Sequence, residues 1–276
     1  MKTVSANGAE IPAIGLGTWE LRGEQCAQLV SSALQAGYTH IDTAQMYKNE
    51  REVGEGIRAS GIDRDKVFVT TKIWPDHFAT DDFARAVDES LALLNCGVPD
   101  LLLLHWPSRT VPIAETITAL NKARRAGLVR HIGISNFTVK QIDEAVALSE
   151  APLVCNQIEF HPLINQDRVR AACARHGLAV TAYCPIARNK VADEPVICAI
   201  AERHNASPAQ IALAWLAGLG DVISIPRSSR PERLVDNLKA LDISLSEDEV
   251  AEISALKSRH MRLVDMESIR PDWDQV

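Results

Sequence analysis

Three apolar runs in the sequence each end in a side chain that can hold or donate a proton. Asp42 follows HI, Lys72 follows VFVTT, and His105 follows four consecutive leucines. Tyr47 stands in the segment DTAQMY, directly after the first run. A tyrosine hydroxyl is a weak acid at neutral pH, but a neighbouring ammonium stabilises the phenolate and lowers the pKa of the hydroxyl. The four residue types together suit proton transfer to a carbonyl oxygen, with Tyr47 as the acid.

The other three side chains would support this proton transfer. Asp42 would hold the Lys72 ammonium in place and offset the free energy lost when that charge is buried. His105 would donate a hydrogen bond to the substrate carbonyl and orient it. Each residue taken alone also has a structural explanation, because ion pairs, core tyrosines and strand-end histidines are all common. Those explanations do not favour an acid, a lysine and a histidine at three successive strand ends, so we prefer the catalytic interpretation.

The pattern of the remaining sequence indicates what brings these residues together. Short runs rich in valine, isoleucine and leucine alternate with longer amphipathic segments, as in parallel strands that are buried on both faces and linked by helices. Residues 81–95 are predicted to form a helix with Thr80 as its N-cap, and residues 208–218 another with Ser207 as its N-cap. The predicted strands lie within 13–19, 40–43, 67–72, 101–105, 131–135, 153–157, 179–183 and 222–226.

Eight such units predict an α/β fold of the (β/α)8 TIM barrel type, with a single domain over residues 1–276. The alternative is an open doubly wound sheet. It is less favoured because GLGTWE (15–20), the only candidate for a dinucleotide-binding loop, lacks the third glycine. An Asn-Gly turn within 5–15 predicts an N-terminal β-hairpin that closes the bottom of the barrel. The strand ends would then meet at the opposite rim, where barrel enzymes place their chemistry.

The composition excludes several classes of function. A net charge of −7 gives no reason to expect nucleic acid or an anionic membrane as a partner, and no apolar run is long enough to span a bilayer. The six cysteines are scattered without a C-x-x-C pair, which predicts reduced thiols in a cytoplasmic protein. Glu159 and His161 have no third ligand beside them, so no metal site is predicted.

A series of longer motifs extends through nearly the whole chain. These are GLGTW (15–19), HIDTAQMYKNEREVGEGI (40–57), TTKIW (70–74), LLLLHWP (101–107), GISNF (133–137), NQIEFHP (156–162), AYCPIA (182–187) and IPRSSRPERLVDN (225–237). In identity and order they resemble the aldo-keto reductases. The nearest likeness is to the bacterial 2,5-diketo-D-gluconate reductase-like branch of that family.

The resemblance implies roles for the residues at the strand ends. The four residues described first would be the catalytic tetrad of an NADPH-dependent reductase that converts aldehydes or ketones, keto-sugars included, to alcohols. NADH would be a weaker alternative cofactor. Ser135, Asn136 and Gln157 would bind the nicotinamide carboxamide, and Tyr183 would stack on the nicotinamide ring.

The segment 225–237 is the expected site for the adenosine end of the cofactor. A basic, hydroxyl-bearing start of a helix near Pro231 suits the 2′-phosphate of NADPH, whereas an NAD-specific site would present a carboxylate to the ribose. The residues around that start are Arg227, Ser228, Arg230 and Arg233. By resemblance, further cofactor contacts would come from Pro185, Ile225, Ser229, Asp236 and Asn237.

A few positions depart from the usual pattern of the family. Arg227 stands where lysine is common, Arg230 where a smaller residue is common, and Asp236 where glutamate is common. Cys184 and Ile186 replace a serine and a leucine after the stacking tyrosine. None of these positions belongs to the tetrad, so they bear on cofactor preference rather than on the reaction.

Four tryptophans are candidates for the wall of the substrate pocket. Trp19, Trp74 and Trp106 all lie beside predicted strand ends. Trp273 lies in the C-terminal segment 262–276, which resembles the substrate-facing tail of the family and could close the pocket. The alternative for this segment is a tail packed on the barrel surface.

Two other functions use the same residues. Lys72 could form a Schiff base in a barrel aldolase, although pairing with Asp42 would keep it protonated and poorly nucleophilic. The chain could instead be a non-enzymatic, NADPH-sensing subunit, although an intact tetrad argues against that. No heptad or exposed apolar stripe suggests assembly, so a monomer with small-molecule partners is expected.

Overall fold

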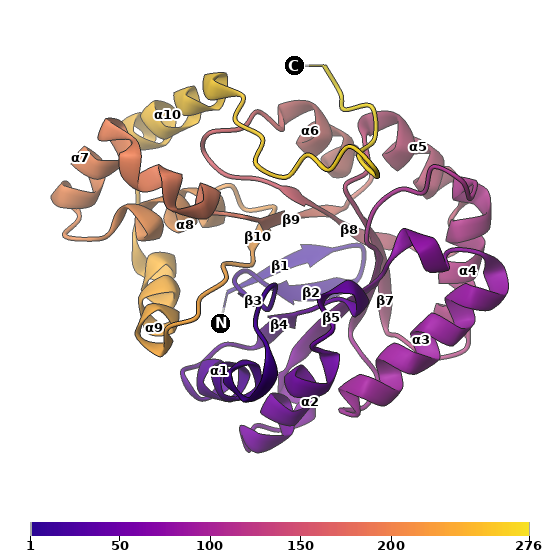
Figure 1. Ribbon diagram of the computed structural model, residues 1–276. Coiled ribbons are helices and arrows are strands. Elements are labelled where there is room, and N and C mark those ends of the chain that lie inside the picture. Colours follow the sequence, from indigo (N-terminus) through magenta and orange to yellow (C-terminus); the bar gives the residue numbers. More distant parts are fainter. Residues whose placement is uncertain (1, 276) are drawn as a thin grey trace.

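The computed structural model describes residues 2–275, in which eight parallel strands curl into a ring surrounded by helices (Figure 1). Neighbouring strands pair in chain order, and every strand end lies within two residues of its predicted position. The (β/α)8 prediction is therefore confirmed. The strands are β3 (Leu16–Gly17), β4 (His40–Asp42), β5 (Phe68–Ile73), β6 (Leu101–Leu104), β7 (His131–Ser135), β8 (Leu153–Glu159), β9 (Ala179–Tyr183) and β10 (Val222–Ser224).

The ring is closed between its first and last strands. Ile14 forms a parallel bridge with Ser224, and the backbone N–H of Gly17 donates to the carbonyl of Pro226 over 3.1 Å. A Cβ atom on Gly17 would come within 2.8 Å of the Ile225 carbonyl oxygen, so only glycine permits this approach. The closure rules out the open doubly wound sheet for this chain.

Helices follow the strands and cover the outside of the ring (Figure 1). Ser207 caps α8 as predicted, in a capping box with Gln210. The predicted cap of α3 was wrong: Ala79 is the N-cap, because the Thr80 hydroxyl instead donates to Glu115 on α4 over 3.1 Å. The helices are α1 (Gly23–Gln35), α2 (Glu50–Ala59), α3 (Thr80–Leu94), α4 (Ile113–Arg125), α5 (Val139–Leu148), α6 (Asp167–Arg175), α7 (Pro195–Arg203), α8 (Pro208–Gly218), α9 (Pro231–Lys239) and α10 (Glu247–Ala255).

The predicted N-terminal hairpin is present as β1 (Thr3–Ala6) and β2 (Ala9–Pro12), which lie behind the ring in Figure 1. Asn7 and Gly8 both have positive φ, at 46° and 86°, as a tight turn that follows strand twist requires. The Asn7 amide donates to the carbonyls of Leu153, where β8 starts, and of His176. The hairpin closes the bottom of the barrel, and its apolar side chains share a buried cluster with Leu101, Leu103, Val154, Ala179 and Ile223.

The four leucines of β6 fix the direction of the residue that follows them. Successive side chains of a strand point to opposite faces. Leu101 and Leu103 accordingly belong to the cluster inside the barrel, whereas Leu102 and Leu104 belong to the cluster that includes the surrounding helices. Full burial of a leucine contributes about 1.5–3 kcal/mol, so a slip by one residue is strongly disfavoured. His105 continues the inward-facing set at the mouth of the barrel.

The segment after α10 runs along one side of the mouth of the barrel, near β8, β9 and α6 in Figure 1. The buried carboxylate of Glu159, at the end of β8, accepts the backbone N–H groups of Leu263 over 2.6 Å and Val264 over 2.8 Å. Near the other end, the Asp274 carboxylate accepts the N–H of Val139 at the start of α5 over 2.9 Å. The tail is thus fastened at two points, the end of β8 and the start of α5, which follow neighbouring strands. Val276, the last residue of the predicted tail, lies outside the described residues.

Candidate active site

The four residues singled out at the strand ends meet at one side of the mouth. Asp42 ends β4, Lys72 lies in β5, His105 follows β6, and Tyr47 ends a short 3-10 helix, η1 (Gln45–Tyr47), after β4. The Lys72 ammonium lies 2.5 Å from the Asp42 carboxylate and 2.7 Å from the Thr43 carbonyl oxygen. It also lies 3.4 Å from the Tyr47 hydroxyl oxygen. The structure therefore brings together the residues that the sequence predicted to act together.

The Lys72–Asp42 pair is almost fully removed from solvent, with 0% and 1% exposure. Burial lowers the pKa of Lys72 from its usual value, and the Asp42 carboxylate opposes that shift. The second Asp42 oxygen accepts the side-chain amide of Gln157 over 2.8 Å. Both oxygens of the Asp42 carboxylate therefore have partners. Gln157 fixes the position of Asp42, and Asp42 fixes the position of the Lys72 ammonium. This bond between Gln157 and Asp42 joins residues 115 positions apart, and no sequence pattern predicted it.

Tyr47 is half-buried, with its hydroxyl at the ammonium and its ring between two aromatic groups. Its ring centroid lies 4.9 Å from that of Trp19 and 5.6 Å from that of His105. Burial, and then the Asp42 carboxylate, raise the pKa of the Tyr47 hydroxyl well above its usual value. The sequence argument expected the ammonium to lower this pKa, whereas in the folded protein burial has the largest effect and raises it. Tyr47 consequently keeps its proton at neutral pH.

His105 is neutral at physiological pH. Burial, and then the Lys72 ammonium, lower its pKa well below the usual value for histidine. Its Nδ1 atom is buried and has no hydrogen-bond partner among the described residues. The ring stands edge-on to Trp74, with centroids 5.1 Å apart. A neutral imidazole carries one N–H, so His105 can donate one hydrogen bond to a group that enters the mouth.

Two of the four predicted pocket tryptophans pack on tetrad residues, and the other two pack on each other. Trp19 packs on Tyr47 and remains 39% exposed, and Trp74 packs on His105. Trp106 is buried, and its ring centroid lies 6.0 Å from that of Trp273 in the tail. The tail therefore brings an aromatic side chain to the residue next to His105.

A set of amide and hydroxyl groups lies beside the tetrad at the ends of β7, β8 and β9. The Ser135 hydroxyl donates to the Gln157 carbonyl over 2.9 Å, and the Asn136 amide donates to the Ser135 hydroxyl over 3.1 Å. The Tyr183 hydroxyl donates to the Asn136 side-chain oxygen over 2.8 Å. The four residues expected at the nicotinamide are thus connected in one network.

The backbone after Tyr183 turns sharply. Positive φ angles occur at Cys184 (50°), Arg188 (50°) and Asn189 (72°), although none of them is a glycine. Such conformations are uncommon and concentrate at binding sites. Pro185 and Ile225, both predicted to contact the cofactor, are buried in this region, and the Ile225 N–H donates to Ala182 at the end of β9 over 3.1 Å. Nothing in the residue types of this loop indicated the turn.

The basic segment after β10 surrounds the start of α9, as the sequence predicted. Arg227, Arg230 and Arg233 are exposed, and none of them forms an ion pair within residues 2–275. Arg230 is the N-cap of α9, and the buried Ser228 hydroxyl accepts the N–H of Arg230 over 3.0 Å. Ser229 is half-buried between them. The Arg227 guanidinium also donates to the Trp19 carbonyl over 3.3 Å. Three guanidinium groups without an ion pair at a helix N-terminus suit an anion.

The two residues predicted to lie near adenine differ from each other. Asp236 is exposed, and its carboxylate pairs with Lys239 over 3.0 Å. Asn237 is buried, and its side chain interacts with the Tyr38 hydroxyl beneath α9. Both residues lie beyond the first turn of α9, whereas the arginines gather around its start. Asn237 therefore already has a partner within the protein, the Tyr38 hydroxyl.

The buried residues Glu159 and His161, considered above as possible metal ligands, bind each other and the tail. The His161 ring lies 3.0 Å from the Glu159 carboxylate, whose oxygens also accept the two tail N–H groups. Within residues 2–275 no group of three candidate ligands is arranged to hold a metal ion. The same residues contain no helix with both the length and the apolar character needed to cross a membrane. Sequence reasoning missed the role of Glu159 in fastening the tail, because its partners are about a hundred residues away.

Comparison with known proteins gives a consistent result over most of the chain. The sequence pattern of the Aldo/keto reductase family matches residues 13–258. Methylglyoxal reductase DkgB of Escherichia coli O157:H7 is 41% identical over 267 residues, which cover 96% of this chain and 99% of that protein.

Solved structures are similar over the same extent. A crystal structure that carries the provisional name 2,5-diketo-D-gluconic acid reductase B superposes with a TM-score of 0.97 at 45% identity, covering 100% of this chain and 98% of that one. The Bombyx mori aldo-keto reductase in complex with NADP superposes with a TM-score of 0.89 at 34% identity, covering 96% and 95% of the two chains.

Proposed function

The chain belongs to the aldo/keto reductase family and is an oxidoreductase that reduces aldehydes or ketones to alcohols, and we propose that Tyr47 supplies the proton in this reaction. One observation carries the proposal. The Tyr47 hydroxyl lies 3.4 Å from an ammonium, Lys72, that is buried and fixed by a carboxylate. Among the four tetrad residues, Tyr47 carries the only hydroxyl. A cation already lies beside it and can stabilise the phenolate that forms when the proton leaves.

The roles of the tetrad follow from its charges. Reduction turns the carbonyl oxygen into an alkoxide, which is a far stronger base than a phenolate, so Tyr47 can donate its proton even with a raised pKa. The Lys72 ammonium stabilises the phenolate that remains, and Asp42 keeps Lys72 in place. Neutral His105 donates a hydrogen bond to the carbonyl oxygen and orients it. In a site shielded from water, a fixed donor of this kind is worth about 10²–10³-fold in rate.

The residues at the mouth fit NADPH as the cofactor, which supplies the hydride when it is bound. Ser135, Asn136 and Gln157 offer amide and hydroxyl groups that match a carboxamide, and Tyr183 offers an aromatic face beside them. The exposed, unpaired arginines at the start of α9 match a phosphate. One part of the rim therefore suits the nicotinamide end of an extended dinucleotide, and another part suits its adenosine end.

The arginines at the start of α9, where the adenosine end of the cofactor would lie, favour NADPH over NADH. The guanidinium groups of Arg227, Arg230 and Arg233 suit the 2′-phosphate, which NADH lacks. Of the two carboxylates of α9, Asp236 is already paired with Lys239, and Glu232 lies in the first turn among the three arginines. NADH would still fit the nicotinamide end, so we expect weaker use of it rather than exclusion.

The substrate class that we propose is a small aldehyde or ketone. The similarity to a methylglyoxal reductase favours short dicarbonyl compounds as first candidates, and the likeness to a structure named as a diketogluconic acid reductase favours keto-sugars next. Trp19, Trp74 and Trp106 would line the pocket, with Trp273 of the tail as its lid.

The two alternative functions have less support. A Schiff-base aldolase needs an unprotonated lysine, but Lys72 touches a carboxylate and the Thr43 carbonyl, which both favour its charged form. A purely NADPH-sensing subunit would not need an assembled tetrad. The relatives described above carry reductase names, in agreement with carbonyl reduction.

We also propose a single-domain, monomeric and cytoplasmic protein. One ring of strands and its helices accounts for residues 3–255, which favours one domain. The exposed large apolar side chains are far apart in sequence, as for Val98, Leu148 and Val235, and do not suggest an extensive interface. All six cysteines are free thiols, which suits a reducing compartment.

The decisive experiment compares the wild type with Tyr47→Phe for NADPH consumption on methylglyoxal, simple aldehydes and keto-sugars. We expect turnover to fall by about 10²–10⁴-fold, because the proton donor is lost, while NADPH binding measured by fluorescence stays within a few-fold. Phenylalanine keeps the ring that packs on Trp19, so the pocket wall remains. Equal turnover by the variant would refute the assignment of Tyr47 as acid.

A further inference from the structure

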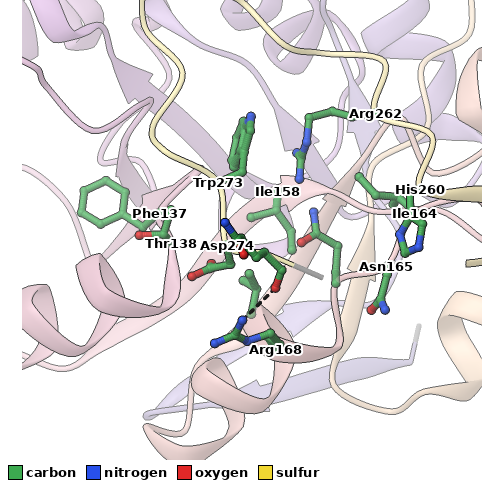
Figure 2. A pocket seen from close by; sticks show the side chains of 13 residues that line it. Phe137, Thr138, Ile158, Ile164, Asn165, Arg168, His260, Arg262, Trp273 and Asp274 are labelled. Carbon is green, nitrogen blue, oxygen red and sulfur yellow. Dashed lines mark hydrogen bonds between the residues drawn. The ribbon is translucent and has the colours of Figure 1, made fainter. Parts of the chain in front are cut away.

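A cavity of about 150 Å³ lies under the C-terminal tail, apart from the tetrad. Its walls come from the tail, from the end of β8, and from the segments that begin α5 and α6 (Figure 2). No tetrad residue lines it. Its apolar lining consists of Phe137, Ile158, Ile164, Val169 and Trp273, and polar or charged side chains, among them Arg262 and Asp274, complete the wall. The cavity is therefore a second pocket, shaped for something with a hydrocarbon body.

One cation in this wall has no partner. The Arg262 guanidinium is half-buried and stacks on the Trp273 ring at 3.8 Å, with both side chains at the edge of the cavity in Figure 2. It forms no hydrogen bond or ion pair within residues 2–275, whereas Arg168 in the same wall donates to the Gln275 carbonyl over 2.7 Å. Burial lowers the pKa of Arg262, since the charge is partly desolvated. A partly desolvated guanidinium that makes no direct contact with an anion is less stable than one that does, and an anion in the cavity would supply that contact.

The carboxylates around Arg262 are committed elsewhere. Glu159 accepts the tail N–H groups, Asp274 accepts the N–H of Val139, and Asp265 accepts the indole N–H of Trp273 over 2.8 Å. All three act on Arg262 through space, but none lies within ion-pair distance of it. His260 also lines the cavity and adds no negative charge. The position beside the guanidinium that faces the cavity remains available to an external acid.

We propose that this cavity binds a small organic carboxylate, with the carboxylate on Arg262 and the hydrocarbon body between Trp273 and the apolar side chains of β8 and α6. A planar guanidinium can donate two parallel hydrogen bonds to one carboxylate. Stacking on Trp273 holds the plane of the guanidinium fixed for that contact. Inorganic phosphate would leave the apolar wall uncovered. The ligand class is therefore a compact monocarboxylic acid, and the site is separate from the one that reduces carbonyls.

Occupation of the cavity would tighten the tail. The ligand would touch the tail on one side and the barrel on the other, and the same tail places Trp273 against Trp106, the neighbour of His105. By linkage, a ligand that stabilises this tail position must bind more tightly when substrate also stabilises it. The site thus offers a way for an organic acid to influence the pocket without entering it.

The test measures binding of benzoate to the NADP-loaded protein by calorimetry, with benzamide as the neutral isostere and inorganic phosphate as the non-carbon anion. We expect benzoate to bind and the other two to bind at least about tenfold more weakly, because only benzoate has both the charge and the ring. Tighter binding of phosphate than of benzoate would overturn the proposed ligand class.

Variants locate the binding. Arg262→Gln should weaken benzoate binding by about tenfold or more, and Arg270→Gln, on the same tail but paired with Asp265, should leave it unchanged. Val169→Phe should block the cavity while it keeps Arg262. A carboxylate could also enter the mouth near Tyr47, so Tyr47→Phe is the second control and should retain the Arg262-dependent binding.

The outcomes separate the two sites. Binding that is lost with Arg262→Gln and Val169→Phe but kept with Tyr47→Phe establishes the cavity site, whether or not the enzyme turns over any carbonyl. Binding that survives both cavity variants, or disappears only with Tyr47→Phe, places the acid in the mouth and refutes the proposal. If Arg262→Gln does not fold, the Val169→Phe result decides alone.

Discussion

The tetrad and the arginine segment are built on opposite principles. At the tetrad, Lys72 and Asp42 are almost without exposure, and each has further partners in the protein. In the segment 227–233, three arginines are exposed and have no ion-pair partner within the described chain. The charges of the tetrad have partners in the protein before a ligand binds, whereas the charges of the arginine segment gain partners only when an anionic ligand binds.

This difference matches what each region has to do. Stabilisation of a developing charge is most effective when the stabilising groups are already fixed, because no reorganisation is needed during the reaction. Capture of a charged ligand from solution requires groups that solvent and ligand can reach. The contrast predicts that changes in the tetrad alter the rate of reduction, whereas changes in the arginine segment alter cofactor binding.

The largest effect is expected for Lys72→Met. The Tyr47 phenolate would lose its cation, so we expect kcat to fall by about 10³-fold. The variant also leaves the Asp42 carboxylate buried without a cation, which typically destabilises a protein by about 3–5 kcal/mol. Single-turnover reduction and thermal unfolding measure the two effects separately.

The control for Lys72→Met is the double variant with Asp42→Asn. It removes the unpaired charge and should recover much of the lost stability, while the rate remains low because the ammonium is still absent. If the double variant also recovered the rate, the loss of rate in Lys72→Met would come from a folding defect. The contrast between the tetrad and the arginine segment would then fail.

A smaller effect is expected for Arg230→Ala. We expect the dissociation constant for NADPH to rise by about tenfold, because one charge-assisted contact to the 2′-phosphate is lost, while kcat at saturating NADPH stays the same. The constant for NADH should not change. Arg125→Ala, which removes an exposed arginine on α4, is the matched control. An equal loss of affinity for both cofactors would show that Arg230 does not recognise the 2′-phosphate.

The smallest effect concerns pH. The pKa of His105 is held well below its usual value, so the ring is neutral above that lowered pKa and would become charged only in more acidic solution. We therefore expect kcat/KM for a neutral aldehyde to show no loss from His105 protonation as the pH falls from 8 to about 6. An acid limb near pH 6.5 that is absent in His105→Gln would contradict this.

The sequence indicated the fold because its signals were local and repeated. Each strand was a short apolar run, and the ends of β7 and β9 were predicted to the residue. The (β/α)8 arrangement then placed Asp42, Lys72 and His105 at one rim without further information. Even the alternation within LLLL, two side chains inward and two outward, follows from strand geometry.

The errors arose where contacts between distant segments outweigh local preference. Thr80 resembles an N-cap, but its hydroxyl is used by Glu115 on the next helix. The pKa of Tyr47 depends on how deeply the folded chain buries it, which the neighbouring residue types do not reveal. The fastening of the tail by Glu159 joins segments about a hundred residues apart. One sequence alone contains no signal for such pairs.

The N-terminal hairpin has a practical consequence for handling the protein. Its turn is tied to the barrel floor through Asn7, so residues 3–12 and any linker joined ahead of them lie on the side away from the mouth. The C-terminal tail instead lies along the rim of the mouth, beside β8 and β9 (Figure 1). Attachment to a bead or electrode through the N-terminal side should leave the mouth of every molecule facing the solution, whereas attachment through the tail would bring the rim of the mouth close to the surface.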